Sequence, residues 1–210
     1  MTDSYDQVLV EDQAQWRAWL HAHHHTSPGI WLVTWKQASG RPALDYEAIV
    51  DEALCYGWVD SRPRRIDDQR SARLLTPRKP GSNWSARNKA RVQRLTAAGR
   101  MHPSGLAAVA AAQANGSWTA LDHVETLAEP PDLTAALDAA PGARHYWDAF
   151  PRSTRRAILE WITNARTGPT RQARIQRTVD DAARNIRANQ WRQPKGRASD
   201  SARQAPGARD

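Results

Sequence analysis

Every strand-like segment of this chain lies in its first half, and this division constrains the fold more than any other feature. Residues 30–36, 58–62 and 71–76 have the β-branched, aromatic or short apolar character of strands. From Pro103 onward the apolar residues recur at helical spacing, and no strand pattern remains. We therefore predict an α+β fold, in which a small antiparallel sheet packed with helices is followed by an all-helical C-terminal part.

Glycine- and proline-containing turns separate the predicted helices. Apolar residues at spacings of three and four predict helices over 12–25, 45–57, 104–115 and 133–140, one that begins at Ser82 or Asn83 and ends at Gly99, and two more that begin at Ser153 and Thr170. We predict three regions: an α+β region that carries the main motifs (1–100), a helical region packed on it (101–190), and a disordered basic tail (191–210).

Charge alternates along the chain in four blocks. Residues 1–57 and 101–150 each carry a net charge of −5, whereas residues 58–100 and 151–210 each carry +9. Two interpretations fit this pattern. The basic blocks form a face for nucleic acid or another polyanion, or the acidic and basic blocks pair with each other in the folded chain.

Composition disfavours several classes of protein. The single cysteine, Cys55, excludes an internal disulfide framework and a cysteine-based zinc site, and its helical apolar surroundings indicate a small buried hydrophobe. The acidic N-terminus does not match a signal peptide, and no apolar run approaches the ~20 residues of a membrane span. The histidine-rich run 21–25 indicates an exposed helix end. We expect a soluble cytoplasmic protein without membrane insertion, metal or cofactor.

The stretch from Gly57 to Asn88 has the composition of a site. It combines tryptophans, a short acid, hydroxyls, an amide and many arginines, and such polar groups need hydrogen-bond partners when buried. The predicted binding residues are Trp58, Asp60, Ser61, Arg78, Lys79, Ser82, Trp84, Ser85 and Asn88. Guanidinium groups suit carboxylate or phosphate, so the predicted ligand is an anion.

Most of these residues also have an ordinary structural interpretation. Trp58 can fill the core, Asp60 can hold an arginine or cap backbone N–H groups, and the serines can cap a helix. Side chains alternate along a strand, so Trp58 and Asp60 are predicted on one face. Trp84 is predicted inside the helix that carries Asn88. The site interpretation is favoured because one segment supplies all these groups.

No recognisable catalytic motif accompanies this stretch. The chain has no G-x-S-x-G elbow, Walker loop, H-E-x-x-H helix or G-x-G-x-x-G turn. Asp60 is the candidate for a general base, without an activated nucleophile or a metal cluster beside it. Enzymatic activity is therefore the less favoured interpretation, and no catalytic residue is assigned.

Four motifs carry a resemblance to a known family. They are ALCYGWVDS (53–61), TPRKPGSNWSARN (76–88), GRMHPSG (99–105) and WITNARTGPTRQARI (161–175). In this order they resemble the bacteriocin-protection, or YdeI/OmpD-associated, proteins over roughly residues 10–190. The resemblance implies a soluble bacterial protein linked to tolerance of stress and antimicrobial peptides, in a family named for association with an outer-membrane porin and without an assigned reaction.

The residues and the resemblance together predict a non-enzymatic cytoplasmic stress-tolerance protein. Its predicted partner is an anionic small molecule or a protein, bound at the surface formed by residues 58–88. Nucleic-acid binding through the arginine- and tryptophan-rich basic face is the first alternative. An enzyme that uses Asp60 as its base is the second.

Overall fold

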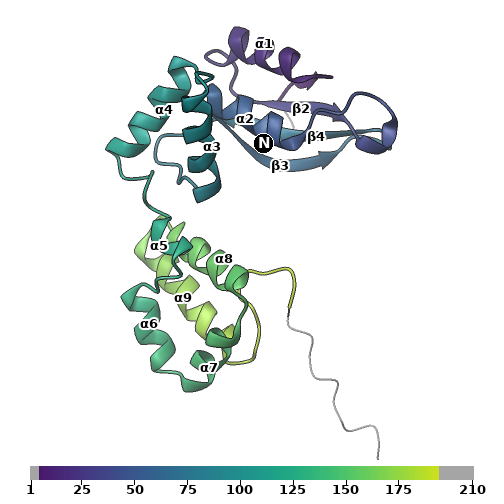
Figure 1. The fold of residues 1–210 in the computed structure, drawn as a ribbon. Coiled ribbons are helices and arrows are strands. Elements are labelled where there is room, and N and C mark those ends of the chain that lie inside the picture. Colours follow the sequence, from purple (N-terminus) through teal and green to yellow (C-terminus); the bar gives the residue numbers. More distant parts are fainter. Residues whose placement is uncertain (1–4, 194–210) are drawn as a thin grey trace, which may run out of the picture. The chain divides into compact units, whose positions relative to one another are not determined.

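The computed structural model describes residues 5–193, which fall into two compact units divided between Asp122 and His123 (Figure 1). The first unit contains a sheet with helices packed on it, and the second is helical. The predicted α+β class with a helical C-terminal part is thus confirmed. The tail predicted for residues 191–210 lies outside the described residues from position 194 onward.

The sheet has four strands in the order β1-β2-β4-β3. They are β1 (Gln7–Leu9), β2 (Ile30–Trp35), β3 (Trp58–Arg65) and β4 (Arg70–Pro77). β4 pairs antiparallel with both β2 and β3, as predicted, whereas β1 pairs parallel with β2 and makes the sheet mixed. β1 escapes sequence analysis because three residues in a polar segment carry no strand periodicity.

Local capping signals set the helices of the first unit, which are α1 (Gln13–His23), α2 (Tyr46–Cys55), α3 (Ala86–Ala97) and α4 (Pro103–Ala114), with a short 3-10 turn at Gln37–Ser39. Asp12 caps α1 by accepting a hydrogen bond from the Gln15 amide. Ser85 caps α3 in the same way. Trp84 therefore precedes the helix, and its predicted place inside it is wrong.

The main core lies between these helices and one face of the sheet. Leu32 and Leu75 project from that face into a cluster that includes Trp16, Trp58 and Trp84. These three indoles are almost completely buried, and each large aromatic ring removes a large apolar area from water. The opposite face of the sheet carries a smaller cluster of Trp31, Val33, Ala72 and Leu74.

β3 is an edge strand with features that oppose pairing to another chain. Its register against β4 shifts between Asp60 and Pro63, as in a β-bulge. Residues 61–65 are exposed and include Pro63, which lacks an amide donor, and three arginines. Proline and charged side chains on an edge strand disfavour edge-to-edge association.

The end of α2 and the start of α4 pack at backbone distance. A Cβ atom on Gly105 would stand 2.2 Å from the carbonyl oxygen of Cys55, so only glycine fits there. The Ser104 hydroxyl donates to the Tyr56 carbonyl at 3.1 Å and ties the same two segments. Cys55 is fully buried, which confirms its predicted packing role.

The second unit is built from α6 (Pro131–Asp138), α7 (Pro141–Ala149), α8 (Arg152–Thr163) and α9 (Gly168–Ala182), with the short α5 (Asp122–Glu125) at the division. Its buried residues include Trp147, whose indole N–H donates to Glu129 at 2.7 Å. The cap of α9 is Thr167, not the predicted Thr170. Ser153 lies within α8 and does not cap it.

Candidate functional site

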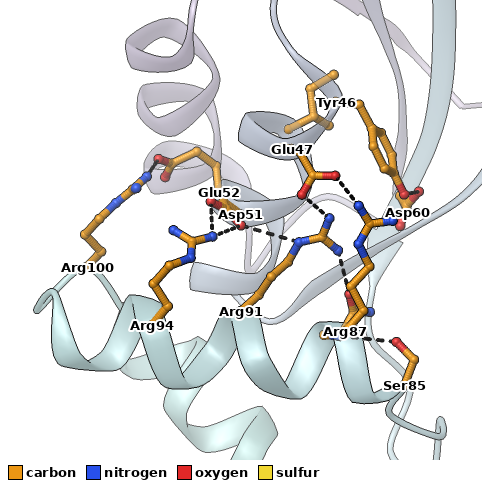
Figure 2. A network of polar contacts seen from close by, with 12 residues as sticks. Tyr46, Glu47, Asp51, Glu52, Asp60, Ser85, Arg87, Arg91, Arg94 and Arg100 are labelled. Carbon is orange, nitrogen blue, oxygen red and sulfur yellow. Dashed lines mark hydrogen bonds and ion pairs between the residues drawn. The ribbon is translucent and has the colours of Figure 1, made fainter. Parts of the chain in front are cut away.

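Acidic residues of α2 bind the arginines of α3 (Figure 2). Glu47 accepts hydrogen bonds from Arg87 at 2.7 Å and from Arg91. Asp51 accepts from Arg94 at 2.7 Å and lies 3.7 Å from the nearest Arg91 nitrogen. These spacings of three and four residues along the helices bring the two charged faces into register.

Glu52 extends this network into the core. Its carboxylate is 1% exposed and accepts from Gln13 at 2.6 Å, from Arg17 at 2.7 Å and from Arg100. Several donors therefore compensate its burial. The acidic block before residue 58 thus pairs with the basic block after it. Of the two interpretations of the charge pattern, pairing between blocks is what the first unit shows.

Three of the predicted site residues have structural roles in the fold. Trp58 is buried, and its indole N–H donates to the His24 carbonyl at 3.1 Å. Ser85 caps α3 through the amide of Asn88. The Asn88 side-chain oxygen accepts from the guanidinium of Arg91 at 3.0 Å.

Asp60 and Ser61 leave the strand in different directions. Ser61 donates to the Leu74 carbonyl at 3.4 Å. One oxygen of Asp60 accepts from the Tyr46 hydroxyl at 3.1 Å and from Arg73 at 3.2 Å. Burial, and then the negative charge of Asp60, raise the pKa of Tyr46. Sequence analysis did not single out Tyr46 or Arg73, because Tyr46 reaches Asp60 through the packing of α2 on the sheet and Arg73 through the pairing of β3 with β4.

Arg78 differs from the paired arginines. Its guanidinium lies over the Trp84 ring at 3.9 Å from the ring centroid and donates to the Asn83 carbonyl at 3.2 Å. Its Nε is buried without a hydrogen-bond partner, and no carboxylate in residues 5–193 forms an ion pair with it. Burial lowers the pKa of Arg78 to about 10, opposed by the more distant charge of Asp60.

A small recess adjoins this guanidinium. The recess, here called the Arg78 recess, has a volume of about 50 Å³ and is lined by Arg78, Lys79, Pro80, Gly81, Ser82, Trp84, Ala108, Ala111, Ala112 and Ser117. The Ser82 amide donates to the Lys79 carbonyl at 3.0 Å, and Gly81 has a φ of +78°. This Pro-Gly turn is the type II geometry in which glycine supplies the positive φ.

Several unpartnered donors surround the Arg78 recess. The indole N–H of Trp84 and the hydroxyl of Ser117 are buried without hydrogen-bond partners, as is Nε of Arg78. Their residues all line the same recess, whose volume matches one or two water-sized groups, at ~30 Å³ each. A carboxylate or a phosphate oxygen presents acceptors to donors of this kind.

The structure thus brings Arg78, Lys79, Ser82 and Trp84 together and places the other predicted residues elsewhere. Ser117 and the three alanines of α4 complete the recess, and sequence analysis did not find them. The small side chains of the alanine-rich α4 allow another segment to pack closely against it, but the sequence does not show which segment that is. Over the described part of the chain, no cluster of three or more histidine, cysteine or acidic side chains forms a metal site, and no helix is long and apolar enough to cross a membrane.

Comparison with known protein families divides the chain in two. Residues 8–108 match a domain of unknown function (DUF8412), and this match contains the motifs at 53–61, 76–88 and 99–105. Residues 126–185 match the family described as bacteriocin-protection, YdeI or OmpD-associated, which includes the motif at 161–175. No curated protein and no solved structure matches the chain. The resemblance expected over roughly residues 10–190 is thus confirmed for residues 126–185, which match the bacteriocin-protection, YdeI or OmpD-associated family model.

Proposed function

We propose that the first unit is a non-enzymatic binding module that recognises an anionic group at the Arg78 recess. The group is a carboxylate or phosphate of a small molecule or of a protein partner. The observation that carries this proposal is a guanidinium with a buried Nε, which has an aromatic face beneath it but no ion-paired carboxylate among residues 5–193.

The neighbouring arginines supply the contrast. Arg91 is more deeply buried than Arg78, at 6% exposed, but it contacts both Glu47 and Asp51. Burying a charge without a counter-ion is unfavourable, and proteins usually avoid it by pairing. An anionic ligand at the recess would give Arg78 the negative counter-charge that Glu47 and Asp51 give Arg91.

Two further observations favour a small anionic group over the alternatives. Many arginines of the basic block 58–100 are engaged by carboxylates, which leaves fewer cations to follow a nucleic-acid backbone. Asp60, the candidate base, is held by Arg73 and Tyr46 through one oxygen. This arrangement suits a fixed structural carboxylate better than a proton acceptor.

The family match gives this binding module a setting. The domain at residues 126–185 belongs to a family whose description names protection against bacteriocins. We place the whole chain in tolerance of stress and antimicrobial peptides in the cytoplasm, with the first unit as its ligand- or partner-sensing part.

The test measures thermal shifts and isothermal titrations with acetate, citrate, phosphate and a short single-stranded oligonucleotide. The Arg78→Met variant removes the unpaired guanidinium, and Arg87→Met, which removes a largely exposed cation, is the matched control. We expect one or more of the small anions to bind the natural chain and the Arg87→Met variant but not Arg78→Met. Equal binding by all three proteins, or a response to the oligonucleotide alone, would contradict the proposal.

A further inference from the structure

A second recess of the first unit lies away from Arg78, between the start of α2 and the sheet. Its volume is about 350 Å³, within the range of metabolite sites. It is lined by residues from β2, the 37–45 connection, α2, β3 and β4. We call it the α2–sheet cavity.

Two hydroxyl side chains lie on the sheet side of this cavity. Thr34 and Ser71 are directly opposed in the β2–β4 register. Thr34 shares its face with Leu32, and Ser71 shares its face with Leu75, so both project from the face that α2 covers. Hydroxyl groups both donate and accept hydrogen bonds, which suits a ligand with the same capacity.

The wall of the cavity carries an ordered polar group. The Arg73 guanidinium lies 4.5 Å from the Tyr46 ring centroid and also donates to Asp60, which does not itself line the cavity. Tyr46 is 38% exposed, which is unusual for an aromatic residue in this unit. The Tyr46 ring thus presents an apolar face beside the fixed guanidinium donor of Arg73.

The charges that line the cavity balance. Lys36 donates its ammonium hydrogens to the carbonyls of Asp67 and Asp68, and Asp45 adds one carboxylate. Arg73 is neutralised by Asp60. An anion therefore gains little here, in contrast to the Arg78 recess.

We propose that the α2–sheet cavity is a second binding site, which takes a neutral hydroxyl-rich molecule of about monosaccharide size. The hydroxyls of Thr34 and Ser71 bond the ligand hydroxyls, while Tyr46 packs on its less polar face. The site shares no lining residue with the Arg78 recess. Ligand binding at this cavity can therefore be confirmed or refuted independently of anion binding at the Arg78 recess.

Ligand-observed NMR on the full chain tests the proposal with glucose, ribose and myo-inositol, and with gluconate and glucose 6-phosphate as anionic counterparts. For so small a ligand, we expect dissociation constants of ~1 mM. The isosteric Thr34→Val variant deletes one cavity hydroxyl. Thr76→Val, on the opposite face of β4, is the matched control.

We expect at least one neutral compound to bind, and Thr34→Val to weaken it by about five-fold, the effect of one lost hydrogen bond. Thr76→Val should leave that affinity unchanged. The proposal is overturned if no neutral compound binds at ~10 mM, if Thr34→Val binds as well as the natural chain, or if the anionic counterparts bind more tightly than the neutral compounds.

Discussion

Replacing Arg78 with methionine should stabilise the protein, whereas the same change at Arg91 should destabilise it. Methionine keeps an unbranched apolar stem against Trp84 and removes the charge. The pKa of Arg78, lowered by burial to about 10, corresponds to at most about 3.5 kcal/mol of unfavourable burial, at ~1.4 kcal/mol for each unit. Solvent contact of the partly exposed side chain reduces this figure.

Two favourable contacts are lost with the guanidinium. The cation–π contact with Trp84 contributes ~1 kcal/mol, and the hydrogen bond to Asn83 contributes ~1 kcal/mol. When these two losses are subtracted from the reduced cost of burial, Arg78→Met is expected to raise the free energy of unfolding by about 1 kcal/mol. For a unit of this size, that gain corresponds to a rise in Tm of roughly 4 °C.

Arg91→Met is the opposing case because it strips a partner from Glu47 and Asp51. Arg94 still pairs with Asp51, and Glu47 is half exposed, so the expected loss is about 1–3 kcal/mol, below that of a fully buried pair. Urea unfolding of both variants, followed by tryptophan fluorescence, measures the two changes. If Arg78→Met lost as much stability as Arg91→Met, Arg78 would be a structural residue and the reasoning would be refuted.

Three other predictions follow from the packing and the titratable groups. Gly105→Ala should lower the free energy of unfolding by at least about 2 kcal/mol, because its Cβ would overlap the Cys55 carbonyl. The control variant Gly142→Ala, which has open space around the new Cβ, should change the free energy of unfolding by less than about 1 kcal/mol. The midpoints of urea unfolding measure both changes. Glu52→Gln should cost about 2 kcal/mol in the same assay, since Arg17 and Arg100 lose their buried counter-charge, and an unchanged midpoint would contradict the pairing. Burial, and then the charges of His24, His21 and Arg17, lower the pKa of His102 below 6.5, so the unfolded chain binds a proton at this histidine more readily than the folded chain does. The free energy of unfolding should therefore fall as the pH drops below 6.5. His102→Asn should remove this part of the pH dependence while keeping a capping side chain for α4.

Strong local signals made much of the fold predictable. Asp12 ahead of an apolar helical pattern marks the start of α1, and the β-branched run at Ile30 marks β2. β1 was missed because its three residues are ordered by pairing with β2, more than twenty positions away. The prediction for Trp84 is wrong because Ser82 and Ser85 are equally good helix caps in sequence. In the structure Ser82 closes the turn that begins at Lys79, and Ser85 caps α3.

The site was predictable to the extent that its groups are close in sequence. Arg78 and Trp84 lie six positions apart and meet in space. Ser117, which completes the Arg78 recess, comes from a loop more than thirty positions away, and Arg73 reaches Asp60 only through strand register. Composition therefore indicated an anion site, but which arginine remains without a carboxylate depends on tertiary packing.

The most direct test of the account is the ¹H–¹⁵N NMR signal of the Arg78 Nε–H group, assigned by its loss in Arg78→Met. The account predicts that phosphate or acetate shifts this signal in a saturable manner, together with the Trp84 indole N–H, while the Arg91 signal stays in place. If the Arg78 signal did not move, or if it moved only in step with all other arginines as ionic strength rose, the Arg78 recess would not be an anion site.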